Sequence, residues 1–287
     1  MKLCLGTAQV GSKYGLLNKK IDKNQLDKII KYLQANKINV IDTAISYGNA
    51  YSRLSKYNLK KFRIITKFNL PKKIKKKEVT KYIINKVQYS LYKMNIDCYY
   101  GLLIHDSKDL IRYPDEIKAA FNNLKKNNKI KKDGISIYTE TELEKIKYTY
   151  KPNIIQIPIN IFNQKFLLNK DLKLLKKNKT EVYVRSIFLR GLLLSDEKTI
   201  NNNKKLPTKL KSRLITWFNW CKKKNFDKIK ILIDLIKHNR LIDYLIVGVD
   251  DYNQLLKINK NFKKKKIKIS LKKFNIDNKK LTDPRLW

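Results

Sequence analysis

The sequence has few cysteines, few acidic residues and few glycines, and these shortages exclude several classes of protein. Its 287 residues include only three cysteines, which lie far apart and form no CxxC pair, so a disulfide scaffold and a cysteine-based zinc site are both disfavoured. No stretch approaches the roughly 18 consecutive apolar residues of a membrane span. The opening residues, Met1 to Val10, lack the apolar core of a signal peptide. We therefore expect a cytoplasmic protein with no membrane partner and no metal site.

The chain carries 66 Lys and Arg residues against 24 Asp and Glu residues, which gives a formal net charge of +42. Only eight of the basic residues are arginines, and the lysines are spread over the whole chain instead of forming one stripe with aromatic residues. Proteins that read nucleic acids usually enrich arginine for its bidentate contacts. The charge therefore fits a solvated surface better than a specific nucleic-acid site, with a basic nucleic-acid binder as an alternative.

Lysine, asparagine and isoleucine are abundant, and all three are encoded by A/T-rich codons. This composition indicates a biased genome that fills permissive surface positions with lysine. Residues that resist such a bias, including the arginines and the eight glycines, are then expected where the backbone or the chemistry requires them. A strongly positive surface would also favour an anionic substrate by electrostatic steering.

Short apolar runs alternate with segments of helical periodicity along the whole chain. Leu26, Ile29, Ile30 and Leu33, for example, follow the spacing of one helix face. Strands are predicted at 3–6, 38–42, 62–67, 98–105, 134–138, 154–159, 182–186 and 241–247, with helices between them that include 140–147, 172–177, a pair within 209–237 and one from 252. Eight parallel strand–helix units over roughly 250 residues predict a closed (β/α)₈ TIM barrel.

The alternative fold is an open, doubly wound sheet. It would require a glycine-rich turn after the first strand, but Gly6 to Gly11 reads GTAQVG and lacks the GxGxxG spacing that cradles a pyrophosphate. No linker or break in composition divides the chain, so we predict a single domain over residues 1–287. Residues 263–287 are predicted to form a tail that packs across the barrel and walls the substrate pocket.

The residues at the ends of the predicted strands are mostly polar, and a barrel brings these ends together at one mouth. In chain order they are Asp42, Lys67, His105, Ser136, Asn160, Ser186 and Gly248, and Tyr47 lies in the loop after Asp42. A buried Asp42 is expected to pair with Lys67, which would lower the pKa of Tyr47, since a nearby cation favours the phenolate. Such a tyrosine can donate a proton to a carbonyl oxygen as hydride arrives, and His105 can polarise the same carbonyl.

Each of these residues also has a simpler interpretation. Asp42 alone could cap the next helix, and His105 alone could be a structural histidine. His238, the only other histidine, is expected at the surface. The joint arrangement of Asp, Tyr, Lys and His favours chemistry.

A family resemblance extends over nearly the full chain in eight segments, which are LGTAQVG, IDTAISYG, ITKF, LLIHD, GISIY, IQIPIN, RSIFLRGLLL and IVGVDDYNQL. At these segments the chain resembles the aldo-keto reductases, which are NAD(P)-dependent (β/α)₈-barrel oxidoreductases. The resemblance implies a catalytic tetrad in which Tyr47 is the general acid, Asp42 and Lys67 tune it, and His105 orients the carbonyl. It also implies nicotinamide-amide contacts at Ser136 and Gln156, within a cofactor site made of Gly6, Thr7, Asp42, Ser136, Gln156, Ser186, Gly191, Gly248 and Gln254.

The chain departs from the family pattern at three places. Ile137 follows Ser136 where the family often has an asparagine, for which Asn160 is the candidate replacement. Asn49 to Arg53 stand where many members have a glutamate after the Tyr-Gly pair. Near the last strand, Asp250 and Asp251 would repel a 2′-phosphate, and Gln254 stands about where an arginine that grips it is expected. Lys257 is a candidate replacement for that arginine, but a lysine lacks its bidentate fork.

The resemblance implies an enzyme that reduces an aldehyde or ketone, and these departures leave both NADP and NAD open as its cofactor. The segments LGTAQVGSKYGLLN, FLRGLLL and DPRLW are similar to a bacterial branch associated with surface-polysaccharide or sugar-nucleotide pathways, which makes a sugar or sugar nucleotide the candidate substrate. The alternative is a catalytically silent, nucleotide-binding barrel that acts as a regulatory or scaffold subunit, against which an intact tetrad argues. The sequence leaves the oligomeric state open.

Overall fold

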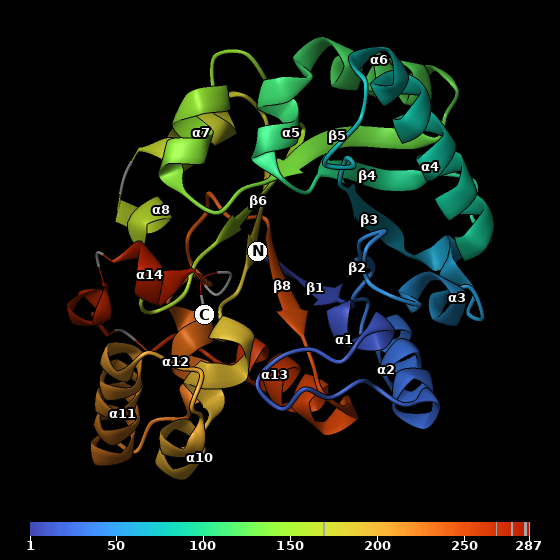
Figure 1. Ribbon diagram of the computed structural model, residues 1–287. Helices are drawn as coiled ribbons and strands as arrows, with labels where there is room; N and C mark the ends of the chain where they lie inside the picture. The colour runs from blue at the N-terminus through green and yellow to red at the C-terminus, as the bar shows by residue number, and fades with distance from the viewer. Residues whose placement is uncertain (169, 268, 277, 284–285, 287) are drawn as a thin grey trace.

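The computed structural model describes residues 1–168, 170–267, 269–276, 278–283 and 286. Eight parallel strands form a closed barrel in the order β1 to β8, and β8 pairs with β1 (Figure 1). The strands are β1 (Lys2–Gly6), β2 (Val40–Asp42), β3 (Arg63–Phe68), β4 (Tyr99–Ile104), β5 (Ile130–Ser136), β6 (Ile154–Pro158), β7 (Glu181–Arg185) and β8 (Tyr244–Gly248). The prediction of a (β/α)₈ barrel is confirmed, and the alternative of an open sheet is wrong.

Helices surround the barrel, as Figure 1 shows. They are α1 (Ala8–Gly11), α2 (Lys23–Ala35), α3 (Ala50–Leu54), α4 (Val79–Met94), α5 (Ser107–Arg112), α6 (Pro114–Lys126), α7 (Glu140–Ile146), α8 (Lys165–Leu168), α9 (Asp171–Lys177), α10 (Glu197–Asn202), α11 (Thr208–Lys223), α12 (Lys228–Asp234), α13 (Tyr252–Lys263) and α14 (Lys279–Thr282). Short 3₁₀ turns lie at Leu59–Lys61, Lys76–Glu78, Leu189–Leu194 and Lys272–Phe274. The predicted pair of helices within 209–237 corresponds to α11 and α12, and α12 begins where Asp227 accepts hydrogen bonds from the first turn.

The strand boundaries differ from the predicted ones where polar residues enter a strand or apolar residues end a helix. β5 begins at Ile130 and not at Gly134, because the lysines and the aspartate between them hide the strand in the sequence. β2 begins at Val40, since the backbone N–H of Ile38 donates to Leu33 O (3.0 Å) at the end of α2. β7 ends at Arg185, one residue before the predicted end, which matters for the site below.

Side chains alternate between the inside and the outside of the barrel along each strand. The barrel interior holds one apolar cluster made of Cys4, Val40, Ile65, Leu103, Ile154, Tyr183, Tyr244 and Ile246. A residue two positions later in a strand points in the same direction. Seven of these interior residues are therefore followed, two positions later, by another inward-facing residue: Gly6, Asp42, Lys67, His105, Gln156, Arg185 and Gly248. The period of two thus projects a set of mostly polar residues into the C-terminal mouth of the barrel.

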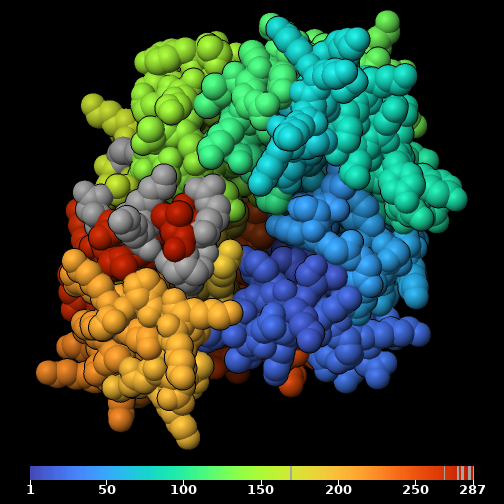
Figure 2. All heavy atoms as spheres, in the orientation of Figure 1, coloured from blue at the N-terminus to red at the C-terminus, as the bar shows by residue number. Residues whose placement is uncertain are grey.

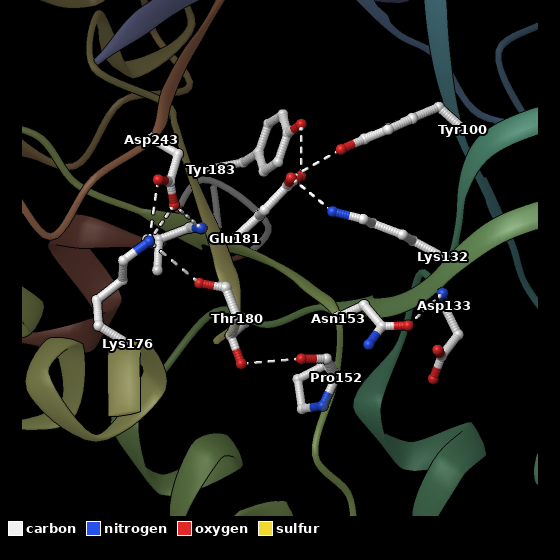
Figure 3. Close-up of polar contacts among 11 residues, drawn as sticks. Tyr100, Lys132, Asp133, Pro152, Asn153, Lys176, Thr180, Glu181, Tyr183 and Asp243 are labelled. Atoms are coloured by element: carbon white, nitrogen blue, oxygen red, sulfur yellow. Dashed lines mark hydrogen bonds and ion pairs between the residues drawn. The ribbon is translucent and has the colours of Figure 1, made fainter. Parts of the chain in front are cut away.

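The opposite end of the barrel is closed by a polar network around Glu181, at the start of β7 (Figure 3). Glu181 Oε1 accepts hydrogen bonds from Lys132 Nζ and from the Tyr100 hydroxyl, both at 2.7 Å, and Oε2 accepts one from Tyr183 at 3.2 Å. The Tyr183 and Tyr244 rings stack with centroids 4.4 Å apart. These contacts fill the N-terminal end with bonded side chains, so the open pocket lies at the other end, where barrel enzymes carry their chemistry.

The described part of the C-terminal segment lies beside α8 and α11, where it is coloured red in Figures 1 and 2. The Phe274 ring contacts the rings of Trp217 and Trp220 of α11, with centroids 5.5 and 5.1 Å apart. Gln164 Nε2 donates to Leu271 O at 2.8 Å. Positions 268, 277, 284, 285 and 287 of the predicted tail lie outside the described residues. Among the helices that the structure describes, none is both long and apolar enough to cross a membrane.

Candidate active site

One pocket opens at the C-terminal mouth of the barrel, and the predicted tetrad and cofactor-site residues line it, whereas Asn160 does not. The predicted residues that line it are Gly6, Thr7, Asp42, Tyr47, Lys67, His105, Ser136, Gln156, Ser186, Gly191, Gly248 and Gln254. The described tail residues do not line this pocket. Thr282 and Asp283 instead line a smaller neighbouring pocket, which shares Tyr138 and Ser186 with the main one.

The floor of the pocket holds a buried ion pair between Asp42 and Lys67. Lys67 Nζ donates to Asp42 Oδ1 at 2.6 Å and to Thr43 O at 2.9 Å. Gln156 Nε2 donates to the same carboxylate oxygen at 2.5 Å. Burial lowers the pKa of Lys67, while the Asp42 carboxylate opposes that shift. The expected pairing of Asp42 with Lys67 is therefore present in the structure.

Tyr47 and His105 lie near Lys67 of this pair. Lys67 Nζ is 5.6 Å from the centroid of the Tyr47 ring, and the His105 ring meets the same ring edge-on at 6.2 Å. The expectation that Lys67 lowers the pKa of Tyr47 is wrong: burial, followed by the Asp42 carboxylate, raises this pKa. The Lys67 ammonium is directed at Asp42 and Thr43 O, so the burial of the Tyr47 phenol determines the direction of its pKa shift. Tyr47 therefore keeps its proton near neutral pH, as a proton donor must.

His105 is held by Asn69, whose Oδ1 lies 3.0 Å from Nδ1 of the ring. Burial, together with the charges of Lys67 and Arg185, lowers the pKa of His105 to about 3, so the imidazole is neutral at ordinary pH. A neutral imidazole carries a single N–H. The orientation of the Asn69 amide therefore decides whether Nε2 of His105 donates a hydrogen bond into the pocket or accepts one.

Several polar groups of the pocket are buried without a partner among the described residues. They include Oε1 of Gln156, Oε1 of Gln9 and Nε of Arg190. An added Cβ at Gly248 would approach Gln9 Oε1 to 2.7 Å, so this glycine keeps the wall of the pocket open. Burying an amide oxygen without a hydrogen bond is costly, which is a reason to expect a ligand donor at Gln156.

The loop after β7 bends tightly around the pocket. Ser186, Leu189, Arg190 and Gly191 have φ values of +66°, +47°, +56° and +92°. Three of these residues are not glycine, and residues that carry a side chain rarely adopt this left-handed backbone conformation. The bends let Ser186, Arg190 and Gly191 all face the same pocket.

The comparison with known families identifies this arrangement. The model described as "Aldo/keto reductase family" matches residues 2–276 of the chain. The chain belongs to the aldo/keto reductase family. It is an NAD(P)-dependent oxidoreductase that acts on small carbonyl compounds. A search of curated protein sequences found no match.

Solved aldo-keto reductases share the fold of this reductase. The holo form of aldo-keto reductase AKR11C1 from Bacillus halodurans superposes with a TM-score of 0.72 at 16% identity, covering 95% of this chain and 90% of that one. Glycerol dehydrogenase AKR11B4 from Gluconobacter oxydans gives a TM-score of 0.70 at 19% identity, covering 94% and 89%. At these identities the likeness concerns the barrel.

Asn160 and Gln254, which stand in for an asparagine and an arginine of the family pattern, have protein partners in this reductase. Asn160 Oδ1 accepts hydrogen bonds from the backbone N–H groups of Phe162 (2.9 Å) and Asn163 (3.1 Å), so it holds a turn and does not line the main pocket. Gln254 Oε1 accepts from the backbone N–H of Asp250 at 2.7 Å, and the Gln254 N–H donates to Asp251 at the N-cap of α13. Gln254 therefore fixes the loop after β8 on the rim of the pocket.

The sequence-based prediction missed Arg185, which also lines the pocket. It named Ser186 as the end of the strand, whereas β7 ends at Arg185. Two signals pointed to this residue. It is one of only eight arginines in a lysine-rich chain, and it shares the inward parity of Tyr183.

The low pKa of His105 predicts a pH-dependent stability. Between its folded value of about 3 and the unfolded value of about 6.5, the unfolded chain binds a proton that the folded chain does not. The free energy of unfolding should therefore fall as pH drops through this window, with a contribution of up to about 1.4 kcal/mol per pH unit. Urea unfolding between pH 4 and 7 should show this slope reduced in His105→Gln.

The matched control is His238→Gln, which removes the other histidine from an exposed position. An equal slope in wild type and His105→Gln would show that His105 is already protonated in the folded protein. That result would contradict a neutral imidazole in the pocket.

Proposed function

We propose that this reductase converts an aldehyde or ketone to an alcohol with Tyr47 as the proton donor. A nicotinamide cofactor supplies the hydride when bound. The Tyr47 hydroxyl gives its proton to the carbonyl oxygen as the hydride arrives at the carbonyl carbon, and the phenolate that remains takes a proton back from solvent after the reaction. The observation that carries the proposal is that the Tyr47 ring lies close to both Lys67 and His105, at 5.6 and 6.2 Å, next to a buried ion pair.

Asp42 acts in this proposal by holding Lys67, and His105 orients the carbonyl. Gln156 connects the ion pair to the proposed cofactor site. Its Nε2 donates to Asp42, while its Oε1 has no partner among the described residues. A carboxamide N–H would satisfy that oxygen, and the Ser136 hydroxyl lines the same pocket. We therefore place the nicotinamide amide at Ser136 and Gln156, within a cofactor site formed by Gly6, Thr7, Asp42, Ser186, Gly191, Gly248 and Gln254.

We infer that the carbonyl substrate is a sugar or sugar nucleotide. Hydroxyl and amide side chains line much of the pocket, including Tyr14, Tyr138 and Ser186, and such groups bind polyhydroxylated compounds. The name of the glycerol dehydrogenase with the same barrel points to polyol chemistry in that relative. A cytoplasmic location and the absence of a specific nucleic-acid partner are part of the same proposal.

A panel of aldehydes and sugars, assayed with each cofactor, tests this function. Turnover supports the reductase, whereas cofactor binding without turnover of any carbonyl compound favours the silent scaffold. The intact Asp42–Lys67 pair speaks for turnover, because a scaffold gains no evident benefit from a buried ion pair.

We predict that NADH binds more tightly than NADPH, by about tenfold. Asp250 is fixed at the pocket rim by Gln9 Nε2 (3.1 Å) and by Gln254, and Asp251 caps α13. These carboxylates would repel a 2′-phosphate. Titration of each cofactor, followed by quenching of tryptophan fluorescence, measures the ratio, and Gln254→Arg should shift it toward NADPH.

Gln34→Arg is the control, since it adds the same charge at an exposed site on α2. Tighter binding of NADPH by the wild type would contradict the predicted preference. Failure of both cofactors to bind at millimolar concentration would overturn the reductase function itself.

A further inference from the structure

Arg185 brings into the pocket a positive charge that no described carboxylate neutralises. Its side chain shares the inward parity of Tyr183, and it stands at the C-terminal end of β7. Arg185 Nη2 donates to Ile137 O at 3.0 Å and Nη1 donates to Ser186 Oγ at 3.2 Å. The guanidinium also lies 4.0 Å from the centroid of the Tyr138 ring. All three contacts are with neutral groups.

Two other buried or half-buried cations differ from Arg185 either in their partner or in their place. Lys67, in the same pocket, is neutralised by Asp42 at 2.6 Å. Arg53 is bound to the backbone carbonyls of Val10 and Ile21, both at 2.6 Å, away from the pocket. Among the described residues no carboxylate forms a salt bridge with Arg185. A guanidinium has five N–H donors, so after its two bonds several remain for a ligand.

The surroundings hold the guanidinium in one orientation. The Ile137 carbonyl, the Ser186 hydroxyl and the face of Tyr138 restrain it from three sides. A restrained fork loses little side-chain entropy when it binds an oxyanion bidentately. The charge also acts on the reacting groups, because it lowers the pKa of His105 and opposes the rise in the pKa of Tyr47. Arg185 is therefore close enough to influence both residues.

Arg190 also lines the pocket, but it faces a different side. Its guanidinium lies 5.5 Å from the ring of Tyr14, in the loop after β1, whereas Arg185 stacks on Tyr138, in the loop after β5. In a closed barrel of eight strands, β1 and β5 are diametrically opposed. The two arginines therefore serve different parts of the pocket.

We propose that Arg185 binds an oxyanion of the substrate, a carboxylate or a phosphate, and so selects carbonyl compounds that carry a negative charge near the carbonyl. This inference rests on the proposed reductase function. It differs from steering by the net charge of +42, which acts at long range and is screened by salt. A single residue in the pocket should account for the preference.

Two matched substrate pairs test the proposal. Succinic semialdehyde carries a carboxylate that butanal lacks, and glyceraldehyde 3-phosphate carries a phosphate that glyceraldehyde lacks. We expect the wild type to prefer the charged member of at least one pair, and the pair identifies the oxyanion. Arg185→Gln should reduce that preference in kcat/KM by about tenfold or more, mainly through KM. Arg185→Lys should fall between the two, because it keeps the charge and loses the fork.

Arg240→Gln is the matched control, since it removes the same charge from an exposed turn. Equal preferences in Arg185→Gln and Arg240→Gln would overturn the proposal and assign the effect to overall charge. A wild type with no preference for either charged member would overturn it as well. Circular dichroism and thermal unfolding of Arg185→Gln establish that the variant is folded.

Calorimetric binding of the unreactive anions butyrate and inorganic phosphate separates this proposal from the reductase function. With cofactor present, Arg185→Gln should weaken the preferred anion about tenfold or more. If that loss occurs in a protein that turns over no carbonyl compound, the reductase function fails and the role of Arg185 stands. If neutral aldehydes are reduced but the anion binds equally well to the wild type and to Arg185→Gln, the role of Arg185 fails and the reductase function stands.

Discussion

Tyr47→Phe is expected to lower kcat for carbonyl reduction by about 10³-fold, with little change in cofactor affinity. The substitution removes only the hydroxyl. Both the ring contact with His105 at 6.2 Å and the position over Lys67 depend on the aromatic ring, which phenylalanine keeps. The proton needed by the carbonyl oxygen would then have to come from water. Single-turnover rates with bound cofactor, together with fluorescence titration of that cofactor, measure the two quantities separately.

The control for this experiment is Tyr14→Phe, which removes a hydroxyl from the same pocket at a residue whose ring lies 5.5 Å from the Arg190 guanidinium. It should cost far less in kcat. Reduction by Tyr47→Phe at the wild-type rate would remove Tyr47 from the mechanism. Comparable losses in both variants would indicate a general disturbance of the pocket.

Lys67→Met is expected to lower the free energy of unfolding by about 3–5 kcal/mol, as well as to abolish activity. Methionine fills much of the same volume, but it leaves the buried Asp42 carboxylate without its cation. Among the described residues, Gln156 Nε2 would remain as a hydrogen-bond donor to this carboxylate, and a neutral amide cannot neutralise the charge. Urea unfolding followed by circular dichroism gives the difference.

The double variant Asp42→Asn with Lys67→Met separates the ion pair from general packing. Since it removes both charges, it should be more stable than Lys67→Met alone by at least about 1 kcal/mol. Lys76→Met serves as the surface control, because the Lys76 side chain is 70% exposed and its contact with Glu116 is 3.4 Å long. A Lys67→Met variant as stable as the wild type would show that the ion pair with Asp42 does not stabilise the fold.

The alternation of apolar runs with helical segments was sufficient to predict the barrel, because parallel strands joined by helices have few ways to bury both faces. The same alternation placed Asp42, Lys67 and His105 at strand ends, where the barrel brings them together. A strand end must be located to one residue to predict which side chain points inward. At β7 the prediction was one residue late, so it named Ser186 and missed Arg185.

The direction of the pKa shift of Tyr47 could not be predicted from residue types. The sequence shows that Lys67 and Tyr47 reach the same mouth, but it shows neither the burial of the phenol nor the direction in which the ammonium points. In the structure Nζ is bonded to Asp42 and Thr43, and dehydration of Tyr47 dominates. The role of Asn160 could not be predicted from its residue type either, because its amide oxygen accepts hydrogen bonds from two backbone N–H groups of its own turn.

The left-handed residues Ser186, Leu189, Arg190 and Gly191 have a consequence for the rate and affinity of cofactor binding at the proposed site. Ordering a loop around a ligand normally costs conformational entropy at the moment of association. Here the bends are part of the folded backbone, so that cost is met when the chain folds. If this loop binds the cofactor as proposed, its wall is already in place before binding, and we expect the association rate to be set by diffusion into the pocket.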